Sequence, residues 1–243
     1  MSILQMNASL LQMQHKRRVY GYLYNFYALS GIANQGWRIP TNNDWESLIA
    51  LCGGRPIAAK KIKGTRSALG VGLDPYIDPC WQASNSAPEV SNEFLLSIYG
   101  AGMANYSHVF SSLRQYGRYW SGSKTSQGAP YRITFGRSDN DTPIFYDTYR
   151  SRSYGYSIRL CRDASPDEVS TIPERLLVRG YYGGNDGKKY TCVRISSLIW
   201  TAENLAETKY NDGSDIPYVT DSAQWSVLTT GARCAYNNDM SYV

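Results

Sequence analysis

Long hydrophobic runs are missing from this sequence of 243 residues. No apolar stretch approaches the roughly 20 residues that a membrane-spanning helix needs. Hydrophobic residues make up 42% of the chain and charged residues 19%, a balance typical of neither an integral membrane protein nor a disordered chain. We therefore expect a soluble globular protein without membrane insertion, long enough to bury a core in one large domain or two modest ones.

Histidine is nearly absent, and the motifs that accompany catalysis are absent as well. Only His15 and His108 occur, without a G-x-S-x-G, an H-E-x-x-H or a phosphate-binding glycine motif. Asp74 and Asp78 could form the carboxylate pair that a glycosidase needs, but each precedes a proline, which indicates a loop. We expect no catalytic residues, no enzymatic activity and no cofactor.

Cysteine is sparse, and its spacing argues against a zinc site. The chain contains no C-x-x-C pair, so we expect no bound metal. Because the number of cysteines is odd, at least one thiol stays unpaired within a chain, which argues against a fully oxidised secreted scaffold. Buried free thiols are the expectation for Cys52, Cys80, Cys161, Cys192 and Cys234.

A strong charge of either sign is also lacking. The net charge is +5, and the basic residues are dispersed apart from the run at 15–18. We expect no nucleic-acid partner, because nucleic-acid-binding domains concentrate their basic residues on one face. Tyrosine and glycine are abundant instead, with 21 of each. Tyrosine offers rigid contact area with a hydroxyl group and glycine permits irregular loops, a mixture typical of binding surfaces.

Residues 1–18 have the pattern of a short amphipathic helix. Their apolar side chains recur at a spacing of seven and form one stripe, at Ile3, Leu4, Met6, Leu10, Leu11 and Met13. Such a helix is marginal alone in water, so we expect it to serve oligomerisation or docking, with a homo-oligomer favoured over intramolecular packing and a trimer as the first expectation. The segment lacks the pattern of a secretory signal, so we expect assembly in the cytoplasm.

Two helices are predicted from their end signals. Thr41 as N-cap, Asp44 in the first turn and a Gly-Gly stop at 53–54 define a helix over 42–52. A second helix follows Asp221 as cap, with Trp225 on its buried side and Gly231 beyond its end. Both tryptophans, Trp45 and Trp225, are expected in the core rather than at a binding site.

The rest of the chain predicts short strands and long loops. Apolar residues alternate with polar ones at 131–135 and again at 156–160, where Ser157 and Arg159 are expected to face away from the core. A polar loop over 136–154 connects these two strands, and a further strand runs through 190–195 towards Trp200. Two helices with many short strands and long loops define an α+β fold.

Four motifs over residues 19–163 resemble the Fibrobacter succinogenes major paralogous domain. They are Tyr20-Gly21-Tyr22-Leu23-Tyr24-Asn25-Phe26-Tyr27-Ala28, Gly36-Trp37-Arg38-Ile39-Pro40-Thr41, Tyr119-Trp120-Ser121-Gly122-Ser123 and Gly155-Tyr156-Ser157-Ile158-Arg159-Leu160-Cys161-Arg162-Asp163. The resemblance covers most of the chain and implies a C-type-lectin-like fold.

The order of the motifs implies a circular permutation of that fold. The segments at 200–205, 209–213 and 234–239 resemble the opening third of the family, yet here they come last. We therefore expect residues 19–163 to form the core, and 164–243 to supply a linker over 164–184 and a segment that completes the same domain. Strand 156–161 is expected beside strand 190–195, within one chain or by exchange between protomers.

The resemblance extends to the variable proteins of diversity-generating retroelements, which carry a mutated segment just before the final strand of this fold. Adenine-directed mutagenesis of Asn codons never yields Lys, Gln, Glu, Met or Trp, and segment 128–161 contains none of these. We expect the binding surface near 118–154, because its aromatic and flexible polar residues have the composition of a paratope. The expected ligand-binding residues are Arg118, Ser138, Asp139, Asn140, Asp141, Phe145, Tyr146, Asp147, Tyr149, Arg152 and Tyr154.

These features predict a receptor-binding variable protein on a phage tail or a cell surface. Its partner would be a bacterial surface receptor, either protein or carbohydrate. A calcium-dependent sugar site is not expected, because the Glu-Pro-Asn and Trp-Asn-Asp tripeptides of such lectins are absent. The alternative is a non-variable structural or surface-assembly protein with the same fold. An adjacent reverse transcriptase gene with a near-copy of the 128–161 coding segment would distinguish the two.

Overall fold

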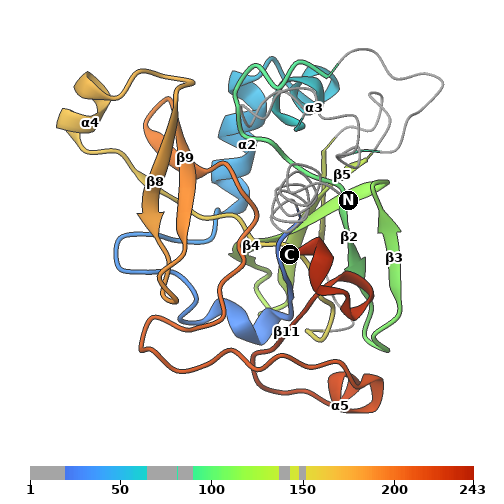
Figure 1. The fold of residues 1–243 in the computed structure, drawn as a ribbon. Helices are drawn as coiled ribbons and strands as arrows, with labels where there is room; N and C mark the ends of the chain where they lie inside the picture. Colours follow the sequence, from blue (N-terminus) through green and yellow to red (C-terminus); the bar gives the residue numbers. More distant parts are fainter. Residues whose placement is uncertain (1–19, 65–80, 82–89, 137–142, 148–151) are drawn as a thin grey trace, which may run out of the picture.

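The computed structural model describes residues 20–64, 81, 90–136, 143–147 and 152–243. In this part of the chain, short strands form three sheets and helices pack against them, so the expected α+β class is confirmed (Figure 1). The helix expected over 1–18 lies outside the described residues.

The largest sheet has five strands, three of which contain residues of segment 118–154, where the sequence predicts the binding surface. Its neighbours are antiparallel except for the central pair β2 and β4, which is parallel. In spatial order the strands are β3 (Phe110–Leu113), β2 (Ala101–Ala104), β4 (Tyr116–Lys124), β5 (Pro130–Gly136) and β6 (Ile144–Asp147). The expectation of one polar loop over 136–154 is wrong at β6, because Ile144–Asp147 pairs with β5 and forms the edge of the sheet.

The second sheet has four antiparallel strands and joins the two ends of the sequence. In spatial order they are β7 (Cys161–Asp163), β10 (Leu198–Thr201), β9 (Lys189–Ile195) and β8 (Leu177–Gly183). Trp200 lies opposite Cys161 on one side and opposite Val193 on the other. The strand expected over 190–195 and on towards Trp200 is two strands, β9 and β10. Strand 156–161 was expected beside 190–195, but only its last residue, Cys161, belongs to this sheet, in β7, and β10 separates β7 from β9.

The segment expected as a linker over 164–184 is itself structured. It contains α4 (Pro166–Thr171) and the edge strand β8, and these two elements project together at one side of the molecule (Figure 1). Ser165 and Glu168 form a capping box at the start of α4. The carboxylate of Glu168 also receives hydrogen bonds from Arg162 and Tyr181, which ties α4 to both outer strands of the four-stranded sheet.

A two-stranded sheet brings the beginning and the end of the described chain together. β1 (Leu23–Tyr24) pairs with β11 (Arg233–Cys234), with Leu23 opposite Cys234. The backbone of Tyr24 exchanges hydrogen bonds of 2.9 and 3.0 Å with that of Tyr156. Tyr22 N donates to Leu205 O at 3.1 Å. Residues before 163 and residues after 185 therefore share one core.

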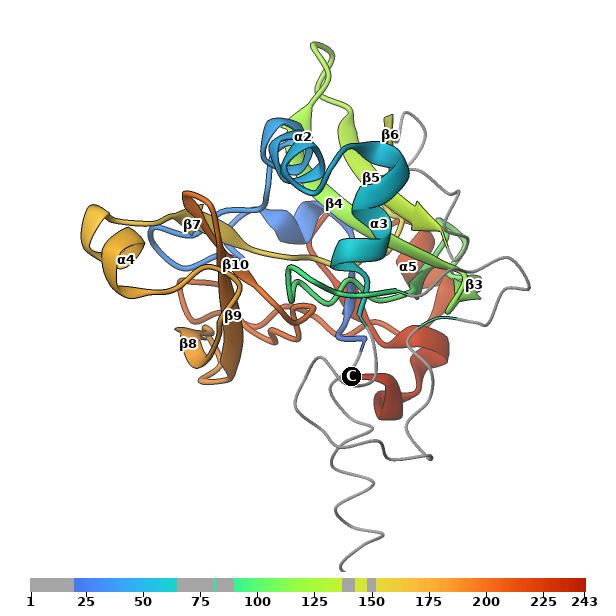
Figure 2. The same cartoon turned by 90° about the horizontal axis from the view of Figure 1, so that it is seen from above.

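The helices lie between and beside these sheets. Thr41 and Asp44 form the expected capping box of α2 (Asn42–Leu51), and the Gly-Gly pair ends it as expected. The ring of Trp45 in α2 lies 5.8 Å from Phe135 of β5 and 5.0 Å from Trp200 of β10, so α2 packs between the two large sheets (Figure 2). The sequence did not predict α3 (Arg55–Ile62). The other short helices are α5 (Ser222–Ser226), which Asp221 caps as expected, η1 (Phe26–Leu29), η2 (Tyr236–Asn238) and η3 (Met240–Tyr242).

Segment 156–160 differs from the expected half-buried strand. Ser157 and Arg159, which were expected to face away from the core, are 0% exposed, as are their apolar neighbours Ile158 and Leu160. The segment runs between β4 and the chain at 201–205 and forms backbone hydrogen bonds with both. Trp120 N donates to Ser157 O, and Leu205 N donates to Ile158 O. The alternation of residue types therefore reflects two buried faces with different chemistry.

The described cysteines are buried free thiols, as the sequence predicted. They are Cys52, Cys161, Cys192 and Cys234. Burial raises the pKa of Cys52, Cys161 and Cys192 to about 12, so these thiols stay protonated and unreactive at neutral pH. Cys80 lies outside the described residues.

Candidate binding surface

The expected ligand-binding residues fall into three groups. Arg118 lies on β4, and Arg152 and Tyr154 lie in the turn that precedes the buried segment 156–160. Phe145, Tyr146 and Asp147 belong to β6. The remaining five, Ser138, Asp139, Asn140, Asp141 and Tyr149, lie outside the described residues.

The register of β6 places Phe145 and Tyr146 on different faces of the sheet, although the sequence predicted both as ligand-binding residues. Tyr146 lies opposite Arg132 of β5, and Phe145 lies opposite Ile133. Directly opposite residues of an antiparallel pair belong to the same face of the sheet. Ile133 is 0% exposed and packs in the core below α2, whereas Arg132 is on the other face. The register therefore favours position 146 over position 145 as part of a binding surface.

Five aromatic rings follow one another across that other face, and we call them the aromatic row. The centroids of Tyr106 and Tyr154 are 6.1 Å apart, and Tyr154 stacks on Tyr156 at 5.7 Å. Trp120 follows at 4.6 Å from Tyr156, and Phe26 at 5.7 Å from Trp120. Trp120 and Tyr156 are buried and form the base of the row, while Tyr106 is 54% exposed and Tyr154 and Phe26 are half-buried.

Basic side chains border the aromatic row. The guanidinium of Arg132 lies 5.4 Å from the ring of Tyr156, and that of Arg152 lies 5.6 Å from Phe26. The ammonium of Lys124 is 5.3 Å from the same Phe26 ring. These distances allow cation–π attraction, which the negative face of each ring provides. Burial raises the pKa of Tyr156 to about 12 although Arg132 and Arg118 oppose the shift, so its phenol remains neutral beneath the cations.

Hydrogen bonds to backbone carbonyl groups fix the turn that carries Arg152 and Tyr154. Phe26 N donates to Arg152 O at 2.9 Å, and the indole Nε1 of Trp225 donates to Ser153 O at 2.6 Å. Gly155 follows, and a Cβ there would lie only 3.2–3.3 Å from Ala104, Leu23 and Trp225, so the chain approaches its neighbours closely at this point. Both sides of the turn are thus anchored while the side chains of Arg152 and Tyr154 reach the surface.

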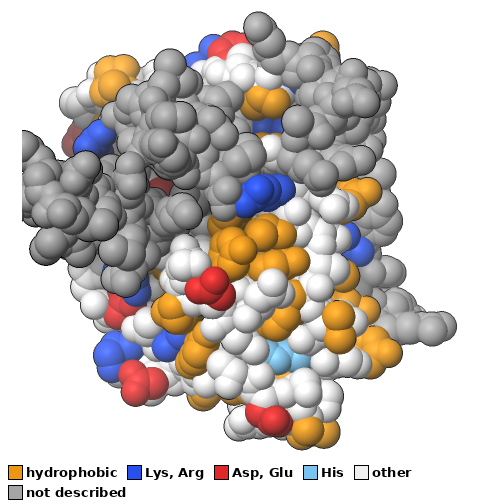
Figure 3. Space-filling model, turned by 45° about the vertical axis from the view of Figure 1, so that its right-hand side comes forward, with side chains coloured by type: hydrophobic (Ala, Val, Ile, Leu, Met, Phe, Trp, Pro, Cys, Tyr) orange, Lys and Arg blue, Asp and Glu red, His pale blue; other side chains and the backbone are white. Residues whose placement is uncertain are grey.

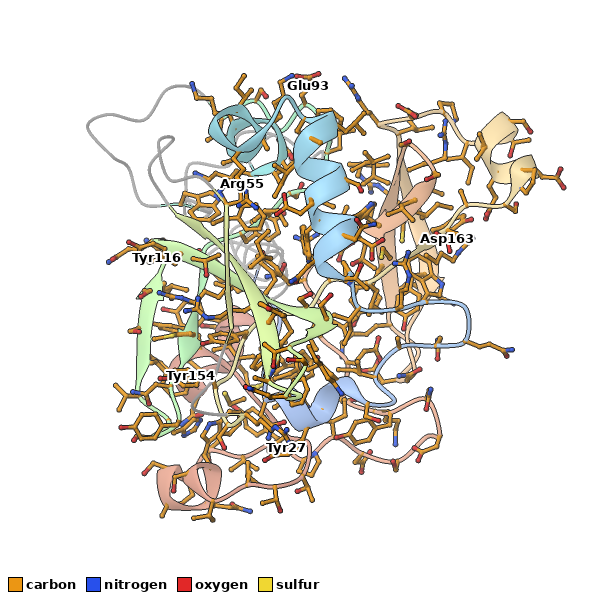
Figure 4. The ribbon with its side chains drawn as sticks, turned by 180° about the vertical axis from the view of Figure 1, so that it is seen from behind. Tyr27, Arg55, Glu93, Tyr116, Tyr154 and Asp163 are labelled. Atoms are coloured by element: carbon orange, nitrogen blue, oxygen red, sulfur yellow. The ribbon has the colours of Figure 1, made fainter. Side chains whose placement is uncertain are left out.

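Two views show where this surface lies. Figure 4 places Tyr154 beside the five-stranded sheet, on the side of the molecule away from Asp163 at β7, and Tyr27 at the bottom, in η1. Figure 3 brings the side with β2 and β3 forward, and hydrophobic side chains gather there with a basic group above them. Tyr106 and Val109, at 54% and 58% exposed, contribute to the exposed apolar area near β3.

Apart from this surface, the described residues form a cavity but no metal site. They contain no group of three or more His, Cys, Asp or Glu side chains placed to hold a metal ion. None of their helices is both long and apolar enough to cross a membrane. A cavity of about 130 Å³ lies elsewhere, lined by Lys188, Lys189, Tyr190, Glu203, Asn204, Ala206 and Val243, and none of the expected ligand-binding residues lines it.

Sequence reasoning missed four residues of the surface. Arg132 had a usable signal, because it alternates with Tyr131 and Ile133 in a strand whose other face is apolar. Phe26, Lys124 and Tyr106 had none, because they come from η1, the end of β4 and a loop and meet the turn at 152–154 only in the folded chain.

The fold and the surface together define an α+β domain that presents an aromatic and basic face beside a candidate variable segment. The family model described as the Fibrobacter succinogenes major domain matches residues 4–162, and the chain belongs to this family. A search of curated proteins and a search of solved structures each find no match. The C-type-lectin-like fold and the circular permutation therefore stay predictions, and residues 163–243 lie outside the family match.

Proposed function

We propose that the protein is a variable binding protein that attaches to a bacterial surface receptor through segment 118–154. The observation that carries the proposal is that buried residues of the fold and exposed residues alternate closely within and just beyond that segment. Trp120, Tyr156 and Ile158 are almost fully buried, while Arg152 is exposed and Tyr154 is half-buried. Substitution of exposed residues usually changes stability by less than about 0.5 kcal/mol. The surface can therefore vary while the fold persists.

The position of β6 supports the same proposal. It is the edge strand of its sheet, so its only strand partner among the described residues is β5. Variation in the chain on either side of an edge strand disturbs one strand pairing at most, whereas a central strand has two. Variation at the exposed positions of 128–161, as in a retroelement-diversified protein, would in this way spare the fold as long as buried positions such as Ile133 and Arg159 are kept.

Display on a phage tail or on a cell surface completes the proposal. The amphipathic pattern of residues 1–18 would hold a homo-oligomer, with a trimer expected first, and several copies bind a repetitive cell surface more tightly than one. Deleting residues 2–15 should lower the mass measured by light scattering. A full-length protein that is already monomeric contradicts this part of the proposal.

Tyr146→Ala tests the binding function, with Phe145→Ala as its matched control. We expect Tyr146→Ala to weaken attachment of the labelled protein to intact bacteria, screened over a panel of strains, by about 1–2 kcal/mol with an unchanged melting temperature. Phe145→Ala should instead lower the melting temperature, because position 145 lies opposite the buried Ile133. The reverse result, unfolding at 146 and lost attachment at 145, would sink the assignment.

The non-variable alternative has its own readout. A structural or surface-assembly protein would attach to no strain of the panel, and neither substitution would matter beyond stability. DNA sequencing around the coding region gives independent information. A reverse transcriptase gene with a near-copy of the segment that encodes 128–161 supports the variable protein, and a closely related phage with an unchanged segment on a different host contradicts it.

A further inference from the structure

The charge of the candidate surface departs from the rest of the chain. Segment 118–154 contains six basic residues, Arg118, Lys124, Arg132, Arg137, Arg150 and Arg152, and three acidic ones, Asp139, Asp141 and Asp147. This short segment therefore supplies three of the five net positive charges of the whole chain. A local excess of one sign attracts ligands of the opposite sign and raises their rate of association.

Two of these cations are placed for a ligand rather than for the fold. Lys124 and Arg152 are exposed, and neither forms an ion pair with a described residue. Both lie against the ring of Phe26, at 5.3 and 5.6 Å. The side chain of Arg152 makes one long hydrogen bond to a described residue, 3.4 Å to Gly128 O. Both charged groups therefore remain available to an anion that approaches the aromatic row.

The aromatic row adds a second kind of contact. Its rings follow one another at 4.6–6.1 Å, and three of the five reach solvent, so they form an extended surface. The apolar C–H faces of sugar rings pack well on aromatic rings, whose faces carry partial negative charge. A carbohydrate chain with charged groups would meet rings and cations in alternation along the row.

We propose that the ligand of this surface is an acidic carbohydrate, a glycan polymer with carboxylate or phosphate groups. The inference rests on the proposed binding function and narrows it to a chemical class. Its sugar rings would pack on Tyr106, Tyr154 and Phe26, and its anionic groups would accept hydrogen bonds from Lys124 and Arg152. Arginine is well suited to this task because its planar guanidinium binds carboxylate and phosphate in two-point contacts.

Binding of defined polymers to the full chain tests the inference. Polygalacturonate carries carboxylates, and a poly(glycerol phosphate) teichoic acid carries phosphates; neutral dextran, polyglutamate and duplex DNA serve as comparisons. We expect one of the two acidic glycans to bind and dextran not to bind, and we expect the affinity to fall by about tenfold or more when salt is raised to about 0.5 M. No binding to either acidic glycan, or equal binding to dextran, overturns the inference. Equal binding to polyglutamate or DNA also overturns it, because charge alone would then suffice.

A charge-matched pair of double variants locates the site. Lys124→Gln with Arg152→Gln should weaken glycan binding by about tenfold or more. Arg179→Gln with Lys189→Gln removes the same charge from exposed positions on the β8–β9 hairpin and should leave binding unchanged. Equal losses in both variants would overturn the site assignment, since net charge would then be the cause. The melting temperatures of both double variants should stay close to that of the parent protein, because all four substituted positions are exposed.

Attachment to intact bacteria separates failure of this inference from failure of the proposed function. If Tyr146→Ala reduces attachment but the Lys124 and Arg152 substitutions and added salt do not, the protein binds a receptor that is not an acidic glycan. If the parent protein attaches to no strain of the panel, the proposed binding function itself is wrong.

Discussion

At the scale of single residues, Arg159 is the least expected feature of the core. Its guanidinium is fully buried and donates to Leu96 O and Thr201 O at 2.8 Å, to Ser97 O at 2.5 Å and to Asn204 Oδ1 at 2.7 Å. Burial lowers the pKa of Arg159, opposed by the nearby Tyr119 and Tyr99. The planar group thus links a loop before β2 to the chain that follows β10.

Replacing Arg159 should therefore be costly. Arg159→Met keeps much of the side-chain volume but leaves four buried acceptor oxygens without this donor, and we expect a loss of about 3–5 kcal/mol in the free energy of unfolding. Arg159→Lys should recover little, because an ammonium cannot donate in four directions fixed for a planar group. Urea denaturation measures both, with Arg179→Met at an exposed position as control. A stable Arg159→Met variant would show that the buried network contributes nothing.

At the scale of elements, the sequence predicts those whose signals are local. The capping box at Thr41 and Asp44 and the glycines after it set the ends of α2, and alternation sets β5. β6 and β8 were not predicted, because pairing with neighbouring strands stabilises them and their own sequences carry no clear strand pattern. Ile144–Asp147 is short and lies among polar residues, and Leu177–Gly183 contains a charge and glycines. Arg159 was placed on the wrong side for the same reason, since alternation cannot reveal a second buried face.

The hairpin between β8 and β9 docks on a buried carboxyl group. Glu207 is 0% exposed, its Oε2 accepts from Asp186 N at 3.2 Å, and its Oε1 has no hydrogen-bond partner among the described residues. A Cβ at Gly184 would lie 1.8 Å from Oε1, so any larger residue there would force the Glu207 carboxyl group to move. Burial, followed by the charge of Asp186, raises the pKa of Glu207 to about 7. The neutral acid is therefore the form that the folded hairpin favours.

This contact predicts a pH dependence of stability. The pKa of Glu207 is higher in the folded chain than in the unfolded chain, so its contribution is fully present below about pH 4.5 and is lost as the pH rises through about 7. The loss should be on the order of 2–3 kcal/mol between these limits. Glu207→Gln should remove this slope from denaturant midpoints measured over that range, while Asp167→Asn on exposed α4 should keep it. An unchanged slope in Glu207→Gln would show that the carboxyl group titrates normally.

At the scale of the whole molecule, the sequence gives the composition of the binding surface but not its assembly. The residues of segment 118–154 could be named in advance because their types are unusual together. Their neighbours could not, because Phe26 and Tyr106 are distant in sequence and reach the turn at 152–154 through the backbone pairing of Tyr24 with Tyr156 and of Ala104 with Gly155. Folding brings these segments together, and no local sequence pattern predicts that they meet.

The same long-range pairing predicts how the chain behaves when it is divided. The family match ends at residue 162, yet β7 pairs with β10, β1 pairs with β11, and Trp200 and Trp225 fill cores built from both parts. A fragment that ends at Asp163 would leave these core surfaces and strand edges uncovered. We expect fragment 1–163 to be unfolded or aggregated alone, and to regain a cooperative thermal transition when it is produced together with fragment 164–243. Circular dichroism and co-purification measure both outcomes, and a fragment 1–163 that folds cooperatively by itself would show that the matched region is a complete domain.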